Sequence, residues 1–481
     1  MKTITKNIFL NTLFCPTRGW LASTKKLTTK LSVADKFRIE QGLEVQKRAR
    51  SVFSEGVLID EKDLESSLNK TKHILTSNRD CSIFEATFKA DNLVTKVDII
   101  KKHNDKLELI EIKSSINDRA EFIDDMAYTT MVTQNSGYNV TGCSLLLISR
   151  DFRLGMDHSE MFKGIEHTNV VLDRAVQFTE FTKYVDEIVH LEKIPEAKLR
   201  FECKNCGFFN DCMGKDNKNH IFDIPRLTQT KFDNLRSLEV TKIEDIPEEF
   251  QLTDNQKIIV NSVKNNTPFI NQNLSIELNK IKYTAYYLDF ETVQTAIPLY
   301  NNIPPYTQIP TQYSIHKCDK NGNIIDHFEF LSDYKRDSRV ELTEKLIDDL
   351  EGEGSIMVYS SFEKTTINKL IKLFPEKETE LNNIIDRLID LEAIIRKNYY
   401  IPEFHGSSSI KVTLPAMIPD MTYDDLEISD GDSASAIFAY LALGRINEKE
   451  VEQVKSNLLK YCKQDTLAMV RIHQKLLNLI S

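Results

Sequence analysis

Apolar and polar residues alternate most clearly in three stretches of the first half of the chain, residues 84–90, 93–101 and 107–115. These stretches are rich in Val and Ile and are separated by short polar segments, which is typical of β-strands joined as hairpins. A helical apolar period covers residues 120–134, and the apolar run 143–149 predicts a further buried strand. Strands with an intervening helix predict an α/β sheet packed on both faces.

A second alternating pattern begins near residue 283. A strand is expected over 283–291, with hairpin partners over 312–318 and 325–331 on either side of the turn DKNGN. One more strand is expected after it, at 355–361. Helices are expected at 338–351, 363–373, 380–397 and 448–479. Three antiparallel strands followed by alternating helices and strands is the order expected of a ribonuclease H-like fold.

The region between these two patterns has a different composition. The polar stretch 214–224 suggests a boundary, and short helices with caps at Thr241 and Thr253 are expected beyond it. The run LRSLEVTKIEDIP has the character of a helix–hairpin–helix, with Val240 where such hairpins prefer glycine. A plain helical connector is the alternative interpretation. The sequence therefore predicts three parts, residues 1–214, 215–282 and 283–481.

Composition narrows the class of protein. The chain has 481 residues, of which 41% are hydrophobic and 28% charged, as in soluble globular proteins. No apolar run reaches the length of a membrane span. The first residues, MKTITKNIFLNTLFC, faintly resemble a signal peptide, but Asn7 and Asn11 interrupt the apolar stretch. We interpret it as the first helix of a cytoplasmic protein.

Charge is distributed unevenly along the chain. The net charge is −10, which argues against a surface coated for non-specific nucleic-acid binding. Residues 1–50 nevertheless hold eleven Lys and Arg against three Asp and Glu, whereas residues 283–481 hold 21 basic and 31 acidic residues. The basic leading segment suits contact with phosphates or is a solvated helix face. The acidic second half needs divalent metal or local basic loops to hold a polyanion.

One set of candidate catalytic residues lies on the first pair of predicted strands. Asp98 and Glu111 occupy adjacent strands of a hairpin, which brings opposed carboxylates to within about 5–8 Å of each other. Lys113 lies two residues after Glu111 and points to the same side. Glu85, on the preceding strand, is a candidate further metal ligand. Acidic residues with a lysine suit a metal-dependent phosphodiesterase, in which the metal activates water and neutralises charge on phosphorus.

Four of the eight cysteines have metal-type spacing. Cys15 stands alone in LFCPTRGW, and FECKNCGFFNDC contains Cys203, Cys206 and Cys212. Four thiolates suit an iron–sulfur cluster or a Zn²⁺ ion. The remaining four, Cys81, Cys143, Cys318 and Cys462, are expected to be buried or idle thiols. Such spacing does not indicate a disulfide framework.

Together, the acidic residues and the cysteines resemble the iron–sulfur nucleases of the PD-(D/E)xK superfamily, which include RecB/AddB-type nucleases. The resemblance covers residues 1 to about 214. It implies a 4Fe–4S cluster on Cys15, Cys203, Cys206 and Cys212, which would staple the two ends of the domain. The chain departs from the family pattern at Gln46, where a histidine is usual, and near Thr129, where a glutamine is usual.

A second set of candidate residues lies in the last part of the chain. In YYLDFET, Asp289 and Glu291 are two residues apart on a strand, so both face the same side. Two adjacent like charges are unfavourable unless a cation lies between them. Near the end, Tyr461 and Asp465 in YCKQD are one helical turn apart. This spacing lets Asp465 bind metal while the Tyr461 hydroxyl orients a water molecule.

This pattern resembles the DEDD exonucleases of the tyrosine subclass. The resemblance covers about 283–481 and implies 3′→5′ exonuclease chemistry with two Mg²⁺ or Mn²⁺ ions. Glu363 stands where that family usually has its second-motif aspartate. Asp386 and Asp390 compete with Glu363 for this role, although solvation on a helix surface also explains them. Lys411 in HGSSSIKVTLPAM is a candidate phosphate contact, or lies in a plain turn into a strand.

The whole arrangement also resembles an uncharacterised bacterial two-part family that joins a RecB-like half with cysteines to a ribonuclease H-like half beginning with LDFET. We therefore expect a metal-dependent nuclease that acts on single-stranded DNA or RNA ends, with DNA favoured. The alternative is a nucleic-acid-binding subunit in repair or defence with one or both sites inactive. Because no phosphate-binding ATPase loop is present in the sequence, unwinding would require a partner such as a helicase.

Overall fold

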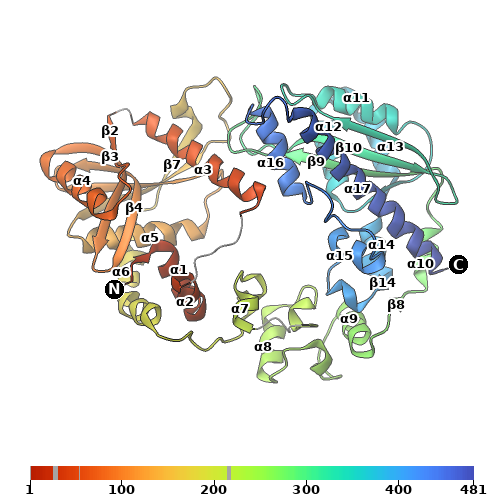
Figure 1. Ribbon diagram of the computed structural model, residues 1–481, viewed down its shortest axis with the longest axis horizontal. Helices are drawn as coiled ribbons and strands as arrows, with labels where there is room; N and C mark the ends of the chain where they lie inside the picture. The colour runs from red at the N-terminus through yellow and green to blue at the C-terminus, as the bar shows by residue number, and fades with distance from the viewer. Residues whose placement is uncertain (1, 25–30, 54, 214–217, 481) are drawn as a thin grey trace. The chain divides into compact units, whose positions relative to one another are not determined.

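The computed structural model describes residues 2–24, 31–53, 55–213 and 218–480 (Figure 1). Contacts divide the chain into two compact units. The first unit contains residues 1–198 and the short segment 295–307, and the second contains 199–294 and 308–481. The expected boundary at residue 214 therefore lies inside the second unit, and the described residues 218–282 pack there with the C-terminal elements.

The first unit is built on a seven-stranded mixed sheet. Its order is β2-β3-β4-β5-β6-β7, and β1 pairs with β4 in parallel. The strands are β1 (Ile4–Thr5), β2 (Gly56–Leu58), β3 (Asp80–Ala90), β4 (Leu93–His103), β5 (Lys106–Lys113), β6 (Asn139–Ile148) and β7 (Phe162–Glu166). Strands β3, β4 and β5 form the expected antiparallel hairpins, and β6 then pairs with β5 in parallel.

Helices cover both faces of this sheet. They are α1 (Lys6–Phe14), α2 (Pro16–Thr24), α3 (Val33–Val52), α4 (Leu64–Ser77), α5 (Ala120–Asn135) and α6 (Thr168–His190). Ile100 and Leu109 belong to a core with α1, α5 and α6, whereas Ile99 and Ile110 belong to a core with α3. Alternate residues of each strand thus enter different cores, which confirms the predicted α/β sheet packed on both faces.

The second unit contains a five-stranded sheet of order β11-β10-β9-β12-β13. Its strands are β9 (Ala285–Val293), β10 (Ile309–Cys318), β11 (Ile324–Leu331), β12 (Ile356–Val358) and β13 (Leu388–Asp390). Strands β9, β10 and β11 are antiparallel neighbours, and β12 is parallel to both β9 and β13. A separate two-stranded sheet pairs β8 (Phe269–Ile270) with β14 (Tyr399–Tyr400).

Two predictions about the last part of the chain, for residues 380–397 and for Lys411, differ from the observed helices of the second unit. The helices are α7 (Phe209–Met213), α8 (Gln229–Ser237), α9 (Asp254–Asn265), α10 (Asn273–Leu278), α11 (Arg339–Asp349), α12 (Phe362–Leu373), α13 (Glu378–Asp386), α14 (Leu391–Asn398), α15 (Ile410–Met417), α16 (Gly431–Ala442) and α17 (Val451–Asn478). The single helix predicted over 380–397 was wrong, because residues 388–390 pair with β12 as a strand. The turn into a strand considered for Lys411 was also wrong, because this residue lies in α15.

The connecting segment 215–282 is helical in part. Thr253 caps α9 as expected, with a reciprocal capping box to Gln256. The cap expected at Thr241 was wrong, because the N-cap position of the following 3-10 turn (Ile243–Asp245) is Lys242, whose side chain makes no capping hydrogen bond. After α8 the chain turns at Glu239, whose φ is +59°, and continues into this 3-10 turn instead of a second α-helix. The described part of this segment therefore lacks the second helix of a helix–hairpin–helix.

No helix among the described residues is long and apolar enough to span a lipid bilayer.

Candidate functional site

Three carboxylates from β9 and α17 come together in the second unit. Asp289 and Glu291 point to one face of β9, because side chains alternate along a strand. The intervening Phe290 packs into the core on the opposite face. Oxygen atoms of Asp289, Glu291 and Asp465 lie within 4.8 Å of one another. The tertiary structure thus joins the two acidic motifs into one group.

Asp465 is buried and Asp289 and Glu291 are half-buried, and the charges of these carboxylates affect one another. Burial first, and then the charge of Asp465, raise the pKa of Asp289 and Glu291 well above their ordinary values. Burial raises the pKa of Asp465 to about 6, even though hydrogen bonds and the positive charge of Lys411 oppose the shift. Three carboxylates that repel one another in a buried site are stable as anions only with additional positive charge.

Two tyrosines contact this group. The Tyr461 hydroxyl hydrogen-bonds to Asp465, one turn away on α17, which agrees with the predicted spacing. The Tyr423 hydroxyl donates to Asp465 Oδ1 at 2.5 Å. Tyr423 lies in the loop between α15 and α16 and has no recognisable spacing to the acidic motifs, so sequence analysis missed it. The two rings lie near each other, with centroids 6.2 Å apart.

Two further groups border the site. Lys411, at the start of α15, is close enough for its charge to lower the pKa of both Glu291 and Asp465. Gly431, at the start of α16, is also adjacent, since a Cβ there would lie 3.5 Å from Glu291 Oε2. Lys411 is thus placed as a source of positive charge at the rim of the carboxylate group.

Glu363 lies at the edge of this site. It is 3% exposed in the first turn of α12, and its charge raises the pKa of both Asp289 and Glu291. Burial and the charge of Asp390 raise the pKa of Glu363 to about 7. Among the described residues, however, its oxygens are outside the group that lies within 4.8 Å.

The two competing aspartates have other positions. Asp390 ends β13 and caps α14, with its Oδ1 accepting the N–H of Ala393 at 2.8 Å. Asp386 is exposed near the end of α13. Only Asp390 thus influences Glu363 electrostatically, and its carboxylate already serves as a helix cap.

The first unit brings its acidic residues to adjacent positions on three strands. Asp98 and Glu111 directly follow the last pair of the β4–β5 ladder, Ile99 with Ile110, and the charge of Glu111 acts on Asp98. The neighbouring register of β3 and β4 places Glu85 opposite Asp98. Glu85 has a φ of +57°, a conformation that is costly for a residue with a side chain and that clusters at functional sites.

Lysines neutralise the carboxylate at the centre of this set. Glu111 is buried, and its Oε1 accepts from Lys6 Nζ at 2.8 Å and from Lys113 Nζ at 3.0 Å. Burial alone would raise the pKa of Glu111, but the two lysines lower it below its ordinary value. Lys113 also forms an ion pair with Asp125 on α5. Sequence analysis missed Lys6 and Asp125, because both come from helices outside the hairpin.

Asp98 is held by different partners. Its Oδ2 accepts the backbone N–H of Ile112 at 2.7 Å, and its Oδ1 accepts from Gln46 Nε2 at 3.3 Å. Burial, with the charge of Glu111, raises the pKa of Asp98 to about 8. Gln46, at which the sequence departs from the pattern it resembles, therefore contacts Asp98. Thr129 instead donates to the backbone oxygen of Asp125.

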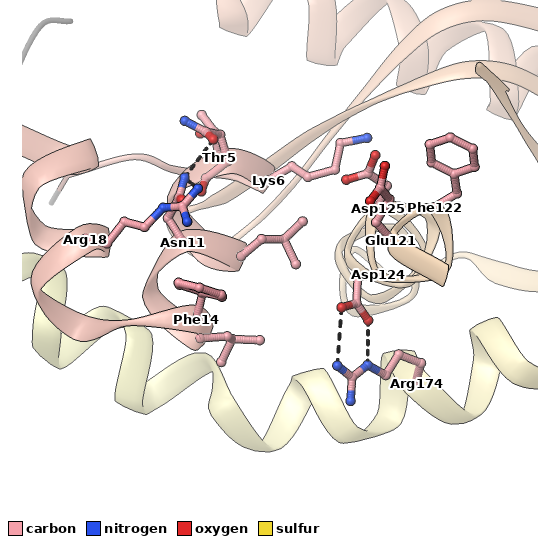
Figure 2. A pocket seen from close by; sticks show the side chains of 13 residues that line it. Thr5, Lys6, Asn11, Phe14, Arg18, Glu121, Phe122, Asp124, Asp125 and Arg174 are labelled. Atoms are coloured by element: carbon pink, nitrogen blue, oxygen red, sulfur yellow. Dashed lines mark hydrogen bonds and ion pairs between the residues drawn. The ribbon is translucent and has the colours of Figure 1, made fainter. Parts of the chain in front are cut away.

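A groove of about 840 Å³ shares Lys6 and Asp125 with this site (Figure 2). Helix α1 forms one wall and the start of α5 the other, with Arg174 of α6 below. Arg174 binds both carboxylate oxygens of Asp124, at 2.7 and 3.4 Å. The groove thus connects the acidic set to a surface that contains aromatic, apolar and basic side chains.

The four cysteines with metal-type spacing belong to both units. Cys15 lies between α1 and α2 in the first unit, and the other three lie on successive short turns of the second unit. The N–H of Cys206 donates to the Cys203 carbonyl at 3.1 Å, and the N–H of Arg200 donates to Cys203 Sγ at 3.4 Å. N–H donors to sulfur are typical of sites in which thiolates bind metal. All four cysteines are half-buried. The four-cysteine cluster stays a prediction.

The other cysteines lie away from this segment. Cys143, Cys318 and Cys462 are buried, and Cys81 is half-buried. Of these, Cys462 lies beside the carboxylate group, because its Sγ is 3.7 Å from Asp289 Oδ2. No disulfide is present among the described cysteines.

The donor atoms of the second-unit site suit particular metals. Carboxylate oxygens are hard ligands, which favour Mg²⁺ or Mn²⁺ over softer ions. The charge of Asp465 contributes, after burial, to the raised pKa values of Asp289 and Glu291, and a divalent cation relieves this repulsion when it binds. The residues present therefore fit such an ion.

Comparison with known proteins shows that the segment carrying part of this site is similar to an uncharacterised family. Residues 286–409 match the family described as Domain of unknown function (DUF2779). This segment contains Asp289, Glu291 and Glu363 and ends before Asp465.

Three relatives also share sequence with the chain, and each bears the description uncharacterised. A protein of Mycoplasma genitalium is 31% identical over 219 residues, which covers 40% of this chain and 32% of that protein. Its homologue in Mycoplasma pneumoniae is 27% identical over 218 residues, covering 40% and 32%. A Ureaplasma parvum protein is 28% identical over 247 residues, covering 46% and 35%. The chain thus spans about a third of the length of these relatives.

Proposed function

We propose that the second unit is a metal-dependent exonuclease that hydrolyses terminal phosphodiester bonds of nucleic acid. The observation that carries the proposal is the group of Asp289, Glu291 and Asp465, with oxygens within 4.8 Å of one another. The sheet order β11-β10-β9-β12-β13, with β9 central and α17 against it, supports a ribonuclease H-like fold. The tyrosine-type DEDD exonucleases have this combination of fold and motifs.

Each residue has a distinct part in this reaction. Asp289, Glu291, Glu363 and Asp465 would together hold two divalent ions. Bound Mg²⁺ or Mn²⁺ supplies an acidified water and neutralises charge that develops on the phosphoryl oxygens. Tyr461 orients the attacking water from its position beside Asp465. Lys411, with its charge near Glu291 and Asp465, holds a non-bridging phosphate oxygen.

The first unit is proposed to be a second nuclease domain of the PD-(D/E)xK type. Asp98 and Glu111, with Glu85 as a further ligand, would hold one divalent ion, and Lys113 would bind the scissile phosphate. A 4Fe–4S cluster, or alternatively Zn²⁺, would be held by Cys15, Cys203, Cys206 and Cys212.

A non-catalytic role for the first unit is the second candidate. The specific observation in its favour is that Glu111 already binds two lysine ammonium groups. In that case the first unit would bind the strand and the second unit would cut it.

The test is digestion of end-labelled single-stranded DNA and RNA by the full chain with Mn²⁺, after anaerobic purification and iron analysis. Asp289→Asn is expected to abolish exonuclease products, whereas the exposed Asp386→Asn serves as the matched control and retains activity. Glu111→Gln and the double variant separate the two units. If neither Asp289→Asn nor Glu111→Gln changes cleavage, the nuclease proposal is wrong. Strand binding without any cleavage by the wild type would favour the binding subunit.

A further inference from the structure

We propose that the groove between α1 and α5 binds an unpaired terminal base of a nucleic-acid strand, so that the first unit selects single-stranded ends. This inference rests on the proposed function of the first unit and names its substrate. It concerns the surface in Figure 2, which the catalytic residues do not themselves occupy.

The position of the groove supports this role. Lys6 lines the groove and also donates to Glu111 at 2.8 Å. Asp125 lines it from the other side and forms an ion pair with Lys113. The groove is therefore adjacent to Lys113, where the scissile phosphate is proposed to bind, because Asp125 contacts Lys113 and also lines the groove.

The walls have the chemistry that binds bases without regard to sequence. Phe14 is 41% exposed, and the guanidinium of Arg18 lies 4.8 Å from the centre of its ring. Leu10 and Leu13 extend the apolar surface between α1 and α5. Aromatic faces combined with arginine are the usual platform for stacking unpaired bases.

Arg18 also has an unused hydrogen-bond donor. Its Nε is buried and has no acceptor among the described residues. Buried donors are nearly always paired, and one that is not requires an explanation such as a ligand. A phosphate or base oxygen seated in the groove would supply the missing acceptor.

The acidic residues of the groove do not oppose a polyanion, because cations of the chain neutralise them. Asp124 is paired with Arg174, Asp125 with Lys113, and Glu121 with Arg119 at 3.3 Å. Residues 2–24, which contain α1 and α2, include the basic residues Lys2, Lys6 and Arg18 and no acidic residue. The groove therefore presents Arg18 and the first turn of α1 to an incoming phosphate.

The size of the groove restricts the substrate. A volume of about 840 Å³ is in the range of small-ligand sites, which are roughly 300–1,000 Å³. It suits one or two nucleotides rather than a base-paired end, in which the bases are stacked inside the helix and unavailable to Phe14.

Photo-crosslinking tests the groove directly. The full chain carrying Glu111→Gln and Asp289→Asn, which prevents cleavage, is irradiated with short oligodeoxythymidylate that ends in 5-iododeoxyuridine. The crosslinked peptide is expected to contain Phe14. The crosslink should be lost in Phe14→Leu and kept in Phe181→Leu, an equally exposed phenylalanine on α6 at 44%. Crosslinks that map outside the groove would overturn the inference.

A kinetic experiment supplies the second measurement. In the Asp289→Asn protein, Arg18→Gln and Phe14→Leu should each lower kcat/KM for single-stranded DNA by about tenfold, the effect of losing one base-stacking contact. Phe181→Leu should leave it unchanged, and equal values for all three variants would refute the groove. If Asp289→Asn protein cleaves nothing, the nuclease proposal for the first unit has failed, and the crosslink still decides whether the groove binds a base.

Discussion

Removal of one carboxylate from the second-unit site should stabilise the metal-free protein. In Asp465→Asn, a carboxylate whose charged form is disfavoured by burial is replaced by a neutral amide of similar shape. The pKa of Asp465 is raised from 3.8 to about 6. A shift of two units corresponds to about 3 kcal/mol of unfolding free energy, because each unit is worth about 1.4 kcal/mol.

The sign of this effect depends on pH. Because the folded-state pKa is raised, Asp465 contributes fully to stability below about pH 4, and this contribution is lost as pH rises through about 6. Asp465→Asn should therefore unfold at a higher temperature than the wild type at pH 8 and at the same temperature near pH 4. At roughly 2–4 °C per kcal/mol, the expected difference at pH 8 is about 6–12 °C.

Scanning calorimetry with EDTA measures this difference, and the single tryptophan supplies an internal control. Trp20 lies on α2 in the first unit, so its fluorescence should report an unchanged transition. Glu452→Gln, on the same helix with a side chain 83% exposed, is the matched variant and should show no pH-dependent gain. Mn²⁺ should stabilise the wild type and not Asp465→Asn. A variant that is less stable than the wild type at pH 8 without metal would refute the reasoning.

Three further predictions concern other parts of the chain. Tyr423→Phe removes the hydroxyl that donates to Asp465 Oδ1, so the acidic limb of the pH–rate profile with Mn²⁺ should move up by about one pH unit. An unchanged limb would show that this hydrogen bond is unimportant. Lys6→Met removes one of the two cations that bind the buried carboxylate of Glu111, and it should lower the unfolding free energy of the first unit by about 1–3 kcal/mol at pH 7. Urea unfolding followed by Trp20 fluorescence measures this loss, and no change would contradict the ion pair. Cys203→Ser should abolish the iron content and the absorbance of anaerobically purified protein, and full retention of iron would exclude the four-cysteine cluster.

Local sequence patterns were sufficient to predict several elements of both units. The hairpins of the first sheet and the strand that carries Asp289 and Glu291 follow from a period of two, which depends only on neighbours along the chain. The facing of Tyr461 and Asp465 follows from the helical repeat in the same way. These features need no knowledge of distant contacts.

Prediction failed where pairing between distant segments decides the structure. The short segment Leu388–Asp390 suits either a helix or a strand, and parallel pairing with β12 makes it a strand. Lys6 and Tyr423 are further examples, because each reaches a carboxylate from an element far away in sequence. No spacing rule links such residues.

The amino-acid order alone therefore specified which residues carry the candidate chemistry and on which kind of element each lies. Folding decided that β9 and α17 meet, that Glu111 receives two lysines, and that Glu363 lies at the edge of the close group of carboxylates. The physical reason is that helical and strand periodicity are properties of short segments. The distances and pKa values of a site arise instead from burial and charge, which exist only once remote segments pack together.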